Sequence, residues 1–182
     1  MRTLRILAAS AAAALAVSVA PAKVFLTQEE ALRLAFPGAT IERKTAFLTD
    51  AQRRAAQKLS GAEDLPAALA TYYRATRDGR EVGTAYFDTH RVRTLPETIL
   101  VVVDPAGAVA RIEVLSFQEP EEFLPRPRWY EQFAGKPLDG ELSLKRGIRP
   151  VSGATLTARA TTDAARRVLA LHRVLHPPAA PR

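Results

Sequence analysis

The pattern of hydrophobic and polar residues predicts strands in the middle of the chain and helices towards both ends. Two short turns, Asp78-Gly79 and Asp104–Gly107, each separate two strand-like runs, and Asp-Gly is a strong hairpin signal. Strands joined by such turns pair antiparallel. We therefore expect an α+β fold, in which an antiparallel sheet is built of sequential hairpins and helices pack around it. The expected strands are residues 70–76, 80–87, 98–103 and 108–117, and the almost continuously apolar third run indicates an interior strand.

Helical patterns occur in three segments. Capping boxes at Thr27–Glu30 and Thr49–Gln52 predict two short helices, which we expect to wrap around the sheet without carrying chemistry. Residues 41–48 alternate between them like a further strand. The third predicted helix, Ala158–Leu175, has an apolar face, formed by Ala164, Val168, Leu171 and Leu175, and an opposite face with Arg159, Arg166 and Arg173.

The first 22 residues have the sequence pattern of a secretory signal peptide. Arg2 and Arg5 precede an apolar run, and Ala20-Pro21-Ala22 resembles a small-residue cleavage site. The alternative is an uncleaved membrane anchor, and in both cases we expect a periplasmic or extracytoplasmic location. The expected organisation is a signal peptide or anchor (1–22), an N-terminal wrapping segment (23–67), a main domain (68–176) and a flexible Pro-rich tail (177–182).

Composition removes several classes of function. The chain has 182 residues and 47% hydrophobic content, enough for a packed core, and it has no cysteine for disulfides, iron–sulfur clusters or thiol catalysis. The formal charge of +7 comes from basic residues scattered along the chain, so we predict no nucleic-acid partner. No Gly-x-Gly-x-x-Gly motif and no acid/base pair stand out, and with only three histidines we predict no metal site and no catalytic residue.

The segment Ser152–Thr157, of sequence Ser-Gly-Ala-Thr-Leu-Thr, carries the clearest chemical signal. Gly153 allows a tight turn and a close approach to a ligand, and Ser152, Thr155 and Thr157 supply hydroxyls just before a helix. A helix N-terminus has unpaired N–H groups and a partial positive charge, which suit a phosphate. The alternative is that these hydroxyls only cap the helix, as Ser and Thr commonly do.

This segment resembles the flavin-attachment stretch of the FMN-binding domain family. That family includes FMN-carrying subunits of the Na⁺-translocating NADH:quinone reductase and of the Rnf electron-transport complex. In the family, the Thr that closes Ser-Gly-Ala-Thr is esterified to the FMN phosphate by an FAD:protein FMN transferase. The resemblance implies that Thr155 is the attachment point, and that Ser152, Gly153, Ala154, Leu156 and Thr157 shape the seat of the cofactor.

Two upstream elements extend the resemblance. Glu119-Pro120 is similar to the acidic residue and Pro that follow a strand in the family, and Gln132–Lys136 is similar to its aromatic–Gln–Phe–x–Gly–Lys stretch. By this resemblance Glu119 and Trp129 are expected at the FMN site, and Trp129, Tyr130 or Phe133 is expected to border the flavin ring. The chain departs from the family in having Arg149 where an Asp commonly precedes the attachment motif. We expect a stand-alone member rather than a subunit of a complex.

The function implied by the resemblance is extracytoplasmic electron transfer by FMN, with membrane or periplasmic redox partners and the transferase as the maturation partner. Two alternatives belong to other classes. The first is a periplasmic binding or adaptor module without flavin, in which the motif serves only as a helix cap. The second is a hydrolase that uses Ser152, which would require a base such as His90 close to that hydroxyl.

Overall fold

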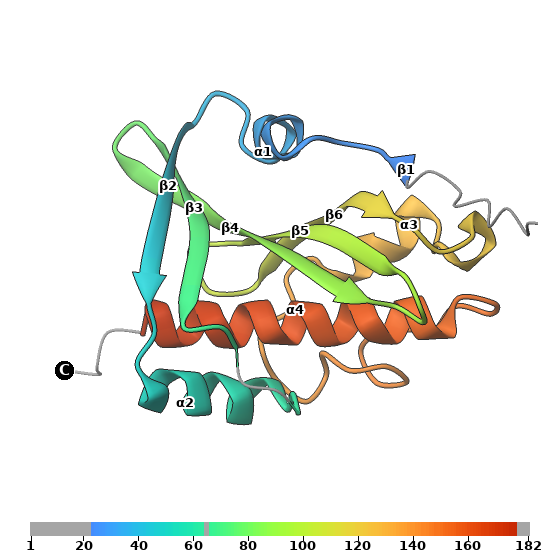
Figure 1. The fold of residues 1–182 in the computed structure, drawn as a ribbon. Helices are drawn as coiled ribbons and strands as arrows, with labels where there is room; N and C mark the ends of the chain where they lie inside the picture. Colours follow the sequence, from blue (N-terminus) through green and yellow to red (C-terminus); the bar gives the residue numbers. More distant parts are fainter. Residues whose placement is uncertain (1–22, 64–65, 178–182) are drawn as a thin grey trace, which may run out of the picture.

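The computed structural model describes residues 23–63 and 66–177, so the expected signal peptide or anchor and nearly all of the expected tail lie outside the described residues. Figure 1 shows one sheet with helices on both of its faces. The strands are β1 (Lys23–Val24), β2 (Thr40–Phe47), β3 (Leu69–Arg77), β4 (Arg80–Arg91), β5 (Pro96–Val103) and β6 (Val109–Phe117). The helices are α1 (Gln28–Ala35), α2 (Asp50–Ser60), α3 (Pro127–Tyr130) and α4 (Thr155–Leu175), with short 3₁₀ turns η1 (Glu121–Phe123) and η2 (Glu131–Phe133).

The sheet is six-stranded, in the order β1-β6-β5-β4-β3-β2, and every neighbouring pair is antiparallel. This confirms the α+β class with sequential hairpins. The N-terminal segment does more than wrap the sheet, because it supplies both edge strands. One of them, β2, was predicted. The other, β1, pairs only Lys23 with Phe117 and Val24 with Ser116, and a two-residue strand leaves no alternation in the sequence to detect.

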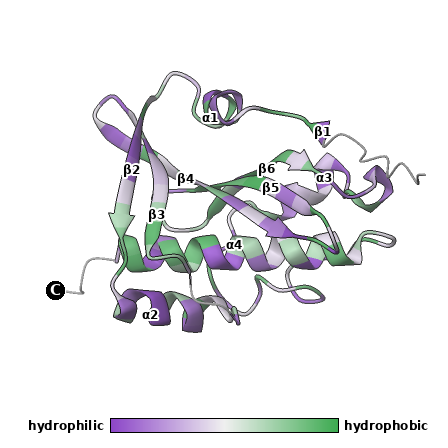
Figure 2. Ribbon diagram, viewed as in Figure 1, coloured by the Kyte–Doolittle hydropathy of each residue, from purple (hydrophilic) through white to green (hydrophobic). Residues whose placement is uncertain are grey.

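Each face of the sheet is covered by its own apolar layer. The side chains of β5 alternate, so that Ile99, Val101 and Val103 face α4, while Leu100 and Val102 face α1. All five are buried, which confirms β5 as an interior strand. In Figure 1 α1 lies above the sheet and the long α4 below it, and Figure 2 shows hydrophobic residues along α4. Among the described residues no helix is long and apolar enough to cross a membrane.

The short helices begin as their capping boxes predict. At α1, Glu30 N–H donates to Thr27 Oγ1 at 3.2 Å and Thr27 N–H donates to the Glu30 carboxylate at 2.8 Å. Gln52 and Thr49 make the same exchange at α2. Helix α2 packs against α4, and the Arg166 guanidinium of α4 donates to the Ser60 carbonyl at the end of α2.

A buried polar network joins α4 to the sheet. The carboxylate of Glu97 on β5 is fully buried and accepts from Thr161 Oγ1 of α4 at 3.1 Å and from Tyr130 Oη at 3.4 Å. His90 Nε2 on β4 lies 3.0 Å from the same carboxylate, and His90 Nδ1 lies 2.8 Å from Asp88. These partners provide Glu97 with the hydrogen bonds that a buried carboxylate requires.

His90 carries the positive charge inside this network. Burial disfavours the imidazolium, but hydrogen bonds and charges from Asp88 and Glu97 outweigh burial and raise the pKa of His90 to about 9. Burial would also raise the pKa of Asp88, yet His90 and Arg167 lower it, and Arg167 donates to Asp88 at 3.0 Å. At neutral pH the network is therefore a row of alternating charges from Arg167 to Glu97.

The network predicts a loss of stability in alkaline solution. Folding raises the pKa of His90 above its ordinary value of 6.5, so its stabilisation is complete below that pH and disappears as the pH rises through about 9. We expect the free energy of unfolding in urea to fall by of order 2 to 3 kcal/mol over this window. NMR titration of the folded protein should assign the transition to His90, and a His90 imidazole that titrates near its ordinary value would contradict the account.

Candidate functional site

The structure places Thr155 at the first position of α4, three residues before the predicted start of the helix. The preceding residue, Ala154, is the N-cap, and no side chain caps the helix there. The Thr155 hydroxyl is exposed and donates backwards to the Val151 carbonyl at 3.2 Å. The first N–H groups of α4 are thus free of a side-chain acceptor, and a hydroxyl lies beside them. The alternative that these residues only cap the helix therefore has no support.

The turn before α4 depends on Gly153. Its φ of +82° lies in the left-handed region that favours glycine, and Ala154 N–H closes the turn on the Val151 carbonyl at 3.2 Å. A Cβ at Gly153 would meet no protein atom within 4 Å, so the backbone conformation, and not protein packing, requires the glycine. Ser152, in the same turn, is exposed.

Thr157 has a role that its sequence position did not indicate. It is fully buried, and its hydroxyl donates to the Phe123 carbonyl of η1 at 2.6 Å. This hydrogen bond fixes the first turn of α4 against η1. Of the three motif residues with hydroxyls, Ser152 and Thr155 are exposed and Thr157 is buried, although the Thr155 hydroxyl also donates to a backbone carbonyl, that of Val151.

A cavity of about 180 Å³ lies at the N-terminus of α4. Its lining brings the motif together with the loop between β4 and β5 and the segment after β6: Gly153, Ala154, Thr155, Leu156 and Thr157 with Val92, Arg93, Glu119 and Phe123. Ser152 and Trp129 do not line it. Cofactor pockets span roughly 300–1,000 Å³, so this cavity can enclose only part of a flavin nucleotide.

Glu119 lines the cavity, but its carboxylate is used by the protein. Glu119 Oε1 accepts the backbone N–H groups of Arg93, Thr94 and Leu95 at 3.2, 2.6 and 2.7 Å. Burial opposes ionisation of the carboxyl, but these N–H donors outweigh it and hold the pKa of Glu119 below its ordinary value. The carboxylate therefore shapes the 93–95 turn, which forms one wall of the cavity.

Trp129 and Gln132 bind the backbone of Arg149, which precedes the motif. The Trp129 indole N–H donates to the Arg149 carbonyl at 2.7 Å, and Arg149 N–H donates to the Gln132 side-chain oxygen at 2.7 Å. Gln132 in turn donates to the Trp129 carbonyl at 2.8 Å. The aromatic–Gln–Phe–x–Gly–Lys stretch thus fixes the backbone that leads into Ser152. The Arg149 side chain is exposed.

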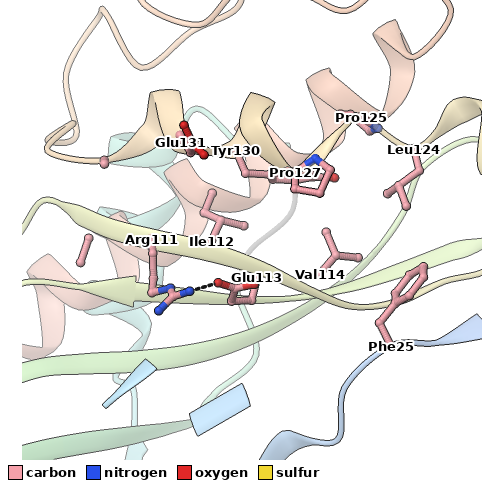
Figure 3. A pocket seen from close by; sticks show the side chains of 12 residues that line it. Phe25, Arg111, Ile112, Glu113, Val114, Leu124, Pro125, Pro127, Tyr130 and Glu131 are labelled. Carbon is pink, nitrogen blue, oxygen red and sulfur yellow. Dashed lines mark hydrogen bonds and ion pairs between the residues drawn. The ribbon is translucent and has the colours of Figure 1, made fainter. Parts of the chain in front are cut away.

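A larger cavity of about 660 Å³ lies between β6 and α3. Figure 3 shows Ile112 and Val114 of β6 facing Tyr130 and Pro127, with Phe25 near one end. Of the aromatic residues expected beside the flavin ring, Tyr130 lines this cavity, which contains neither Glu119 nor any residue of the Ser152–Thr157 motif.

The hydrolase alternative requires a free base near Ser152. His90 does not meet this requirement, because one ring nitrogen is bonded to Asp88 and the other to Glu97. The His90–Glu97 network itself was not predicted from the sequence. A polar pair on facing strands within an apolar sheet, here His90 opposite Glu97, is the signal that could have indicated it.

Comparison with known proteins shows what this chain resembles. Residues 95–170 match the family model described as the FMN-binding domain, and this range contains Glu119 and the whole motif. The crystal structure of NqrC from Shewanella oneidensis is similar in fold, with a TM-score of 0.55 and 17% sequence identity. The alignment covers 82% of this chain and 90% of NqrC. A sequence search among curated proteins found no match. Residues 95–170 therefore resemble an FMN-binding domain, and the fold of the chain is similar to that of NqrC.

The role of Glu119 gives a prediction about stability. Glu119→Ala removes the acceptor of three backbone N–H groups and should lower the free energy of unfolding by about 2 kcal/mol, whereas Glu119→Gln, which keeps a carbonyl oxygen, should cost about half of this. Urea denaturation measures both. Glu122→Ala is the matched control, because Glu122 is exposed and lies only three residues away. If all three variants are as stable as the wild type, Glu119 does not hold the turn.

Proposed function

We propose that this protein is an extracytoplasmic electron carrier whose FMN is attached by a phosphoester to Thr155. The observation that carries the proposal is the accessible Thr155 hydroxyl at the uncapped N-terminus of α4, inside the region that matches the FMN-binding domain. The other hydroxyl within the cavity lining, that of Thr157, is buried and bonded to Phe123.

The residues present suit a flavin nucleotide. A phosphate on Thr155 would lie beside the unpaired N–H groups of the first turn of α4, which stabilise negative charge. Val92, Phe123 and Leu156 give the adjoining cavity apolar walls that suit part of a flavin ring. Bound FMN would supply one- and two-electron transfer, and the protein would supply attachment, orientation and a shaped environment.

The attachment step needs FAD and a transferase. The Thr155 oxygen forms a bond to the phosphorus on the FMN side of FAD, the bond to the AMP phosphate breaks, and the hydroxyl proton leaves with AMP. The exposed position of Thr155 gives an enzyme access to it. The transferase and the membrane or periplasmic redox partners remain proposals that follow from the resemblance.

Co-expression with an FAD:protein FMN transferase tests the attachment. Mass spectrometry of the denatured protein should place one FMN on the peptide containing Ser152–Thr157. Thr155→Val keeps the shape of the side chain but removes the hydroxyl, and should abolish the modification, whereas Thr155→Ser should retain part of it. Thr157→Val is the matched control and should remain modified, although the lost bond to Phe123 should lower its stability by about 1 kcal/mol.

The state of the flavin after denaturation distinguishes an ester from non-covalent binding. FMN that is lost on denaturation would contradict the ester while leaving FMN binding intact, and a colourless product would contradict both. If only an Arg149→Asp variant is modified, the transferase requires the acid that this chain lacks, and the natural protein would bind FMN without the ester.

The proposed location predicts a processed N-terminus. Cleavage after Ala22 leaves Lys23 as the first residue, so β1 and its pairing with β6 are kept. Protein from the native host should begin at Lys23 and be found in the periplasmic fraction, as shown by N-terminal sequencing. An intact Met1 in the membrane fraction would indicate an anchor, and a cytoplasmic pool would contradict the proposed location.

A further inference from the structure

The C-terminal end of α4 carries two histidines that the proposed function does not use. His172 lies in the last turn of α4 and His176 is the C-cap, and the His176 N–H donates to the His172 carbonyl at 2.8 Å, so the two residues lie one helical turn apart. Their ring centroids are 4.7 Å apart. At 1.5 Å per residue, this pair lies roughly 25 Å along α4 from Thr155. The prediction of no metal site overlooked this spacing.

Both rings open onto a cavity of about 470 Å³ that Glu81 also lines. His172 Nδ1 lies 3.0 Å from Tyr86 Oη, and His172 Nε2 has no hydrogen bond among the described residues. His176 Nε2 is buried and also has no hydrogen-bond partner within this part of the chain. A buried ring nitrogen without a partner is costly, which calls for an explanation.

The charges at this end of α4 suit a cation. The carbonyl groups of the last turn give the C-terminus of the helix a partial negative charge, and Glu81 adds a carboxylate to the lining of the same cavity. The imidazole ring is the commonest metal ligand among side chains.

We propose that His172 and His176 bind a divalent transition-metal ion of the Zn²⁺ type through their Nε2 atoms, with Glu81 as a third ligand. Two imidazoles one helical turn apart and a carboxylate suit Zn²⁺, whereas Mg²⁺ and Ca²⁺ prefer oxygen ligands. No three metal-ligating side chains are already gathered among residues 23–63 and 66–177. Glu81 is exposed, and within the described part of the chain its carboxylate accepts a hydrogen bond only from Thr84 Oγ1, so a rotation of its side chain would bring it to the histidines.

Tyr86 acts as a positioning residue for this site. When His172 Nδ1–H donates to Tyr86 Oη, the lone pair is on Nε2, the nitrogen that can bind metal. The Tyr86 hydroxyl oxygen has lone pairs that can accept this hydrogen bond, and Tyr86 is itself held by burial in the core. Outer hydrogen bonds of this kind change metal affinity by about 10- to 100-fold.

Isothermal titration of the untagged full chain with Zn²⁺ alone tests the proposal. We expect one ion per chain with a Kd in the micromolar range, and no heat of binding with Mg²⁺. His172→Asn and His176→Asn should each weaken binding at least tenfold, and Tyr86→Phe about tenfold. Glu81→Gln should weaken it a few-fold, because Glu81 must rotate to reach the ion.

Arg173→Gln is the matched control, because Arg173 lines the same cavity without an imidazole, and it should bind Zn²⁺ at least as tightly as the wild type. Circular dichroism identifies any variant that fails to fold. Because each histidine is replaced separately, the other variant still tests the proposal if one of the two is unfolded. Absence of Zn²⁺ binding at 100 µM protein would overturn the proposal. Unchanged affinity in both folded histidine variants would also overturn it, and would show that the pair only packs against Tyr72, which contacts His176 edge-on at 5.2 Å.

Discussion

The buried carboxylate of Glu97 is the interaction on which the position of α4 depends. An ionised carboxylate in an apolar interior is costly unless hydrogen bonds and an opposite charge compensate it. Thr161 supplies a bond from α4, Tyr130 supplies one from α3, and His90 supplies the charge from β4. Because these donors come from separate elements, the carboxylate favours one arrangement of α4 and α3 on the sheet. The apolar contacts of α4 with Ile99, Val101 and Val103 stabilise the same arrangement.

A fixed α4 sets the position of Thr155 at its first turn. Three further contacts define the surroundings of that residue: Thr157 bonds to Phe123, Glu119 holds the 93–95 turn, and Trp129 with Gln132 holds Arg149. None of these contacts uses the Thr155 hydroxyl or fills the cavity beside it. The residues around the cavity thus divide into those whose contacts shape it and Thr155, whose exposed hydroxyl lies beside it.

The sequence predicted the parts of the fold that rest on local chemistry. Both capping boxes, the Asp78-Gly79 turn and the apolar run of β5 depend on residues close together in the chain, and each was recognised from spacing alone. The two-residue β1 was missed because its pairing with β6 is the only reason it is a strand.

The sequence pointed to residues around the candidate site, but it could not indicate the contacts that their side chains make. Gly153–Thr157 and Glu119 line one cavity, while Ser152 and Trp129 lie outside its lining and Trp129 bonds to the Arg149 backbone. The role of Glu119 could not be read from the chain, because its three N–H donors come from a loop more than twenty residues earlier. Partners so distant in sequence leave no local pattern.

The most direct test of the central claim is the chemical state of the phosphate on the loaded protein. FMN itself is a phosphate monoester, which loses its second proton near pH 6, whereas a phosphoester to Thr155 makes a diester that has no such proton. The account predicts that the ³¹P NMR signal of the loaded, denatured and dialysed protein stays at one chemical shift between pH 5 and pH 8. A signal that titrates across this range, or the absence of any phosphorus signal after dialysis, would contradict it.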